Sequence, residues 1–145
     1  MTQLKTETVL RYARGAMPKA GDVLEATGVK LRMISIEPDL LEMEAAYEGT
    51  GSLPPAHHHP SQEERFTVLE GRVMTIIAGE SRIYEAGESF DVPAGTTHQM
   101  GGEGPARIRW EVRPALRTAE FFERAYSGNT GENFLKEFKN EFVLD

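Results

Sequence analysis

The sequence predicts an all-β protein, a barrel or a double-sheet jelly roll, that ends in a short helical tail. Many short β-rich or alternating segments follow one another at close, regular spacing between residues 29 and 112. The 14 glycines and 8 prolines are spread along the chain as turn residues rather than gathered in a linker. Beyond Pro114 the apolar period changes from that of a strand to that of a helix. We therefore expect an N-terminal arm at 1–28, one β-barrel domain at 29–114 and a helical segment at 115–145.

The first two strands are expected at 29–36 and 41–47. In the second of them the apolar side chains alternate with glutamates, so that one face is apolar and the other charged. The Glu-Pro-Asp sequence at 37–39 is a turn. These two segments are thus predicted to pair as antiparallel strands.

A meander of further strands is expected after the proline-containing stretch at 51–60. The dipeptides at 70–71 and 79–80 each contain a glycine and suit hairpin turns. In the last segment Ile108, Trp110 and Val112 share one side, while the arginines, Arg109 among them, take the other. The expected strands are 64–69, 73–78, 81–85, 89–92, 97–100 and 106–112.

The tail is predicted to form two helical stripes. Thr118 is the expected N-cap, and Gly128 ends the first stripe. Five of the seven phenylalanines fall in this tail, which must therefore be buried. It can pack on the outside of the barrel or form a subunit interface, and with the many edge strands it leads us to expect a homodimer. The stripes are Phe121, Phe122, Ala125 and Tyr126, and then Phe134, Leu135, Phe138 and Phe142.

Charge and composition exclude several classes of function. Lysine and arginine total 16 against 23 acidic residues, a net charge of −7 with no long basic run, which disfavours nucleic-acid and anionic-membrane binding. The absence of cysteine excludes disulfides, thiolate metal sites and a cysteine nucleophile. No segment has the apolar length of a membrane span or of a secretory signal, so we expect a cytoplasmic protein.

The four histidines lie between residues 57 and 98. In an extended segment His57 and His59 share one face and His58 takes the other. Glu64 begins an apolar segment five residues later, and His98 follows a turn at 93–96. Three imidazoles and one carboxylate form a nitrogen and oxygen set suited to iron, manganese, nickel, zinc or copper, and unlike the all-oxygen sets used for calcium.

Two spaced motifs carry the resemblance to a known family. The first consists of Gly51, His57, His59, Glu64 and Gly71, and the second of Gly87, Pro93, Gly95 and His98. With these spacings the sequence resembles a small single-domain cupin. The second motif usually ends in Asn four residues after its histidine, and Gly102 stands there instead.

The resemblance implies a cupin-type double-stranded β-helix and a metal bound inside it by His57, His59, Glu64 and His98. One divalent transition metal is expected, with iron or manganese favoured and nickel, zinc or copper as alternatives. Cupins with this ligand set include dioxygenases, sugar-phosphate and keto-acid isomerases, decarboxylases and proteins without an assigned reaction. The fold does not choose among them.

Two functions of different classes follow. The first is a small metalloenzyme, an oxygenase or a lyase or isomerase, that acts on a small organic substrate in an apolar pocket shaped by Phe66, Val68 and Met100. The alternative is a non-catalytic module that binds a metal and a small ligand. A second titratable group in the pocket would favour the enzyme. The candidates for this group are Tyr47, Tyr84 and Arg109, and the sequence assigns none of them.

Overall fold

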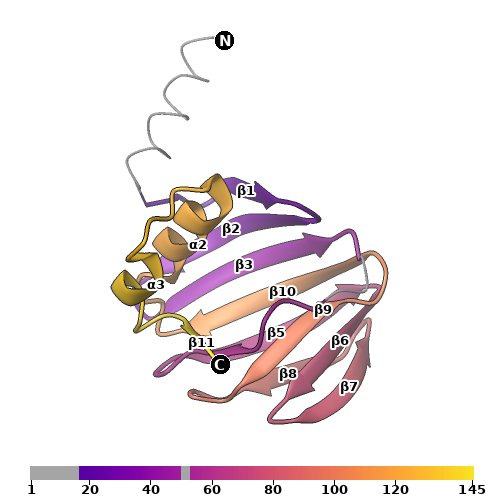
Figure 1. The fold of residues 1–145 in the computed structure, drawn as a ribbon. Coiled ribbons are helices and arrows are strands. Elements are labelled where there is room, and N and C mark those ends of the chain that lie inside the picture. Colours follow the sequence, from indigo (N-terminus) through magenta and orange to yellow (C-terminus); the bar gives the residue numbers. More distant parts are fainter. Residues whose placement is uncertain (1–16, 50–52) are drawn as a thin grey trace.

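The computed structural model describes residues 17–49 and 53–145, and its strands form two antiparallel sheets (Figure 1). This confirms the predicted all-β jelly roll with small C-terminal helices. The six-stranded sheet has, in spatial order, β1 (Val23–Ala26), β2 (Val29–Glu37), β3 (Leu40–Tyr47), β10 (Ala106–Arg113), β5 (Glu63–Glu70) and β8 (Ser89–Val92). The five-stranded sheet has β11 (Val143–Leu144), β4 (His57–His58), β9 (His98–Gly102), β6 (Arg72–Ile77) and β7 (Glu80–Glu85).

Strand alternation places the core between the sheets. In β5 every second side chain, Glu64, Phe66 and Val68, is buried at 2% exposure or less. The neighbouring strand β10 contributes Ile108 and Val112 to the same core. The inner faces are therefore apolar, with Glu64 as a buried charge among them.

The turn between β5 and β6 depends on Gly71. Its φ of +74° lies in the left-handed region, and a Cβ placed there would meet the carbonyl oxygen of Pro105 at 2.2 Å. Both the conformation and the space therefore require glycine. This gives the glycine of the first motif a physical reason, whereas Gly51 lies outside the described residues.

The first tail helix, α2 (Thr118–Ser127), begins differently from the prediction. Arg117 is its N-cap and makes no side-chain capping bond, while Thr118 is the first helical residue. The hydroxyl of Thr118 instead accepts a hydrogen bond from Nε2 of Gln62 at 2.7 Å, which binds the helix to the barrel. Gly128 ends the helix in a left-handed conformation, as expected.

The second helix, α3 (Phe134–Glu137), is a single turn, shorter than the stripe suggested. Phe138 follows it and is fully buried, whereas Leu135 is exposed and Phe142 lies beyond the helix, next to β11. Phe121, Phe134 and Phe138 form a second apolar cluster, and Phe122 and Phe142 pack against it. All five tail phenylalanines are thus engaged within the chain itself.

The predicted N-terminal arm contributes a strand. β1 lies at the edge of the six-stranded sheet and pairs with β2, while residues 1–16 of the arm are outside the described part. Within the described residues, the helices are too short or too polar to cross a bilayer.

Candidate metal centre

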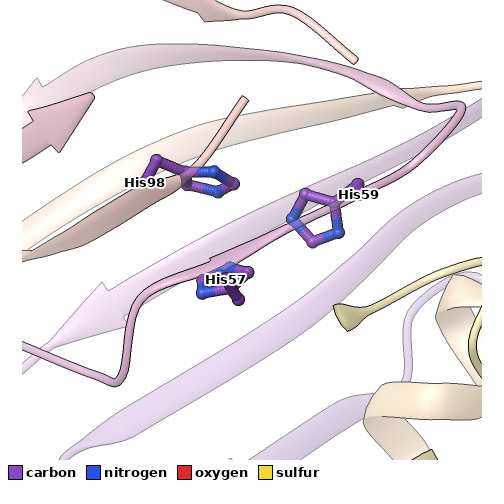
Figure 2. A group of neighbouring side chains, drawn as sticks. All are labelled: His57, His59 and His98. Carbon is purple, nitrogen blue, oxygen red and sulfur yellow. The ribbon is translucent and has the colours of Figure 1, made fainter. Parts of the chain in front are cut away.

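The histidines and the glutamate come together from both sheets. His57 on β4 pairs directly with His98 on β9, and His59 follows β4 immediately. Glu64 is the second residue of β5, in the opposite sheet. The ligand nitrogens of the three histidines lie within 4.8 Å of one another, and Figure 2 shows the imidazoles grouped together.

The Glu64 carboxylate completes the group. Its Oε1 lies 3.2 Å from Nε2 of His59 and 3.1 Å from Nε2 of His98. Its Oε2 accepts a hydrogen bond of 2.8 Å from the indole Nε1 of Trp110. The carboxylate is 1% exposed, so water does not compete for it.

Each imidazole is held from behind by a backbone carbonyl. A carbonyl can only accept, so each Nδ1 carries a proton, and in the neutral imidazole each Nε2 keeps a lone pair for the group. The bonds run from Nδ1 of His57 to Pro55 O at 3.0 Å, of His59 to Glu141 O at 2.6 Å and of His98 to Thr96 O at 2.8 Å.

Two buried atoms of the group have no hydrogen-bond partner. They are Nε2 of His59 and Oε1 of Glu64, which lie close together without the geometry of a hydrogen bond. Buried polar atoms are normally satisfied, and a pair that faces a shared space is what metal coordination requires. The residues therefore fit a divalent transition metal with nitrogen and oxygen ligands.

The electrostatics keep the carboxylate charged and one imidazole neutral. Burial, aided by the neighbouring imidazoles of His98 and His59, lowers the pKa of His57 to about 4. Burial alone would raise the pKa of Glu64, but the imidazoles of His59 and His98 beside the carboxylate outweigh it and lower that pKa to about 2. Burial likewise opposes the charged form of His59, but the Glu64 carboxylate outweighs burial and raises the pKa of His59. The Glu64 carboxylate is thus anionic at neutral pH and faces the imidazole nitrogens that would bind a metal.

His58 points away from this group, in agreement with the alternation. Its Nδ1 lies 2.8 Å from Oδ1 of Asp145. The strand argument therefore separated the two inward imidazoles from the outward one.

A cavity of about 310 Å³ opens onto the imidazoles. Of the three residues expected in the pocket, Phe66 and Met100 line this cavity, whereas Val68 lies two residues beyond Phe66 along β5 and is completely buried in the core. Among the described residues that line the cavity, none is a lysine or an arginine. The aromatic lining residues are Tyr47, Phe66, Trp110, Phe122, Tyr126 and Phe142.

Of the candidate titratable groups, only Tyr47 lines the cavity. Tyr84 instead stacks on Phe90 in the core, with ring centroids 4.2 Å apart. Arg109 forms an ion pair with Glu42. Tyr126, which the sequence reading placed in a helical stripe, joins Tyr47 at the cavity wall. Burial raises the pKa of Tyr126 to about 12 and that of Tyr47 further, so both phenols stay protonated.

Gly102, the position that departs from the second motif, also lines the cavity. A Cβ there would lie 2.6 Å from the carbonyl oxygen of Gly104 and 3.1 Å from Cβ of Tyr47. A larger residue would therefore displace the turn or Tyr47. In this chain the glycine permits close packing beside the cavity.

The comparisons agree with this architecture. The family model described as "Cupin domain" matches residues 44–112. Among solved structures, KdgF from Halomonas sp. superposes with a TM-score of 0.59 at 21% identity, over 64% of this chain and 86% of that one. An RmlC-like cupin from Shewanella frigidimarina gives 0.61 at 18% identity, over 68% and 87%.

A third solved structure is Streptomyces PAC13 with uridine, at a TM-score of 0.58 and 16% identity over 69% of this chain and 81% of that one. A further structure of Pac13, a nucleoside dehydratase, gives a TM-score of 0.58 at 15% identity, over 70% of this chain and 82% of that one. These identities establish likeness of fold. Among curated proteins, no sequence matches the chain.

Proposed function

The chain is a small protein of the cupin superfamily, and on this premise we propose that it is a metal-dependent enzyme acting on a small organic substrate. The reaction class is that of an oxygenase, or of a lyase or isomerase. The ligands are His57, His59, Glu64 and His98. Iron or manganese is the favoured metal, with nickel, zinc or copper as alternatives.

One observation carries the proposal. Three imidazoles whose Nδ1 atoms are bound to carbonyls, and whose Nε2 atoms are therefore free to coordinate, face a buried carboxylate oxygen that lacks a hydrogen bond. A hydrogen-bonded polar cluster in a core would leave no such atoms unpaired. When bound, a divalent metal here would act as a Lewis acid and would orient a substrate at its open positions.

The cavity indicates the class of substrate. Aromatic rings line it from the six-stranded sheet and from the tail, and among the described lining residues no lysine or arginine is available to pair with a phosphate or a polycarboxylate. We therefore favour an uncharged or singly charged molecule with an apolar ring or chain. Its oxygen atoms would face the metal ligands while its apolar part contacts the rings.

The two tyrosines favour an enzyme over a passive binding module. Tyr47 and Tyr126 keep their protons at neutral pH and line the same cavity as the ligands. Each can donate a hydrogen bond to a substrate oxygen and so hold it in one orientation. A module that used the metal only to stabilise its fold would need neither phenol at the wall.

The test is metal loading followed by ligand binding and turnover. Reloaded protein should bind catechol, an uncharged aromatic ring with two adjacent oxygens, and should not bind glucose 6-phosphate in isothermal titration. Small aromatic diols and hydroxy ketones are then screened for turnover, with an oxygen electrode to separate oxygenases from lyases and isomerases. Metal binding without turnover of any of them would favour the non-catalytic alternative, and failure to bind a transition metal would refute both.

A further inference from the structure

The last described residues, 141–145, contact the histidines of the candidate metal centre directly. We propose that this segment, here called the clasp, positions the imidazoles, so that docking of the clasp and binding of the metal stabilise each other. The metal half of this inference rests on the proposed function, but the positioning of the imidazoles does not.

The clasp contacts both candidate ligands of the 57–59 segment, His57 and His59. The carbonyl of Glu141 accepts the Nδ1–H of His59 at 2.6 Å, the shortest of the three carbonyl contacts. The ring of Phe142 stacks on the ring of His57, with centroids 4.6 Å apart and planes 20° apart. One clasp residue thus sets the tautomer of His59, and the next fixes the plane of His57.

The clasp also pairs with the outer edge of β4. β11 pairs with β4, with Val143 opposite His58 and Leu144 opposite His57. On its other side β4 pairs with β9 through a single residue pair, His57 and His98. A strand of two residues with so little pairing depends on its second neighbour for its position.

The end of the clasp is fastened to the same part of the barrel. The Asp145 carboxylate bonds to Nδ1 of His58 at 2.8 Å and to the hydroxyl of Thr97 at 2.9 Å, and its backbone N–H donates to Ala56 O at 3.0 Å. Thr97 immediately precedes His98. The contacts of the clasp therefore reach the 57–59 segment and the residue that precedes His98.

The beginning of the clasp is held by the helices. The side chain of Glu141 is 4% exposed, and its Oε2 accepts the backbone N–H of Arg117 at 3.1 Å, beside the start of α2. The N–H of Glu141 donates to the carbonyl of the fully buried Phe138. The clasp is thereby anchored between the aromatic cluster of the tail and the metal centre.

These contacts require reciprocal coupling. If a docked clasp holds the imidazoles in the arrangement that binds metal, the metal must favour the docked clasp by the same factor. Loss of outer contacts to metal-binding histidines typically weakens metal affinity by about ten- to a hundredfold. We expect Phe142→Ala to fall in that range. Asp145→Ala removes a partly exposed pair and should weaken affinity by up to about fivefold.

The experiment compares Phe142→Ala with Leu144→Ala, a control in the same segment whose side chain is 47% exposed. In metal-free protein with ¹⁵N-labelled imidazoles, NMR should show a slowly exchanging Nδ1–H on His59 in the parent and in Leu144→Ala, and should lose it in Phe142→Ala. Co(II) titration against a chelator should give the ten- to hundredfold loss for Phe142→Ala and a change below twofold for Leu144→Ala. If Phe142→Ala does not fold, Asp145→Ala replaces it, with faster exchange of that proton as the expected result.

Two results would overturn the clasp proposal: retention of the His59 Nδ1–H at parental exchange rates in the clasp variant, or a Co(II) affinity equal to that of Leu144→Ala. A parent protein that takes up no metal would refute the proposed function instead. In that case the metal-free NMR comparison alone decides whether the clasp positions the imidazoles.

Discussion

Trp110→Phe isolates the hydrogen bond that holds the carboxylate of the candidate metal centre. The indole Nε1 donates to Oε2 of Glu64 at 2.8 Å, and phenylalanine removes this donor while keeping an aromatic ring. The ring should preserve the contacts with Phe66 and Phe122, whose centroids lie 5.3 and 5.2 Å from that of the indole. The substitution therefore changes the polar contact more than the packing.

The magnitude follows from the burial of the carboxylate. Glu64 is 1% exposed, so water cannot readily replace the lost donor. A hydrogen bond to a charged group contributes about 1.5–3 kcal/mol, and each 1.4 kcal/mol corresponds to a factor of ten. We expect the free energy of unfolding of the metal-free protein to fall by about that amount. Because the freed carboxylate is no longer oriented, metal affinity should fall by about tenfold or more.

Urea unfolding followed by circular dichroism measures the stability, because Trp110 is the only tryptophan and its loss removes the fluorescence signal. Competition with a chelator measures the affinity. Phe122→Leu is the matched control, since it disturbs the ring packed on Trp110 and leaves the indole donor in place. Parental affinity in Trp110→Phe, together with weakened affinity in Phe122→Leu, would show that packing rather than the hydrogen bond holds the site.

Three further predictions concern pH, the β5–β6 turn and assembly. The lowered pKa of His57 means that the unfolded chain binds more protons between pH 6.5 and 4, and Glu64 acts in the same direction between 4.5 and 2. The stability contributed by these groups should thus fall as pH decreases through those windows. In acid urea melts His57→Gln and Glu64→Gln should each remove part of this loss of stability, and an unchanged pH dependence in both variants would contradict the reasoning. Gly71→Ala should destabilise the fold by about 2 kcal/mol or more, through its positive φ and the clash with Pro105, and an unchanged urea midpoint would contradict this. The homodimer expected from the edge strands should appear in light scattering, whereas a mass near 16.1 kDa would exclude it.

Sequence reasoning identified the candidate site because its signals are local. The alternation of a strand separates His57 and His59 from His58, and the spacing to Glu64 follows from one turn and one strand start. The strand positions came from the same alternation and from glycine-containing turns. These inferences need only the order of the residues.

The parts that sequence reasoning missed depend on contacts between distant segments. The donor to Glu64 comes from Trp110, 46 residues away, and the acceptor for His59 is a backbone carbonyl 82 residues away, which residue identity does not encode. Thr118 was expected to cap its helix, but Gln62 from the barrel occupies its hydroxyl. Val68 was expected in the pocket because it points inward in the same alternation as Phe66. Alternation gives the face of a strand, however, and not the depth at which a cavity ends.

The metal content of reloaded variants tests the central claim most directly. After chelation and reloading, elemental analysis should find one metal ion per chain in the parent protein and far less in His59→Ala, His98→Ala and Glu64→Gln. His58→Ala should keep its metal, with an affinity reduced by at most about fivefold, because its imidazole bonds to Asp145 on the other side of the strand. Loss of the metal from His58→Ala while His59→Ala retains it would contradict the assignment of the site.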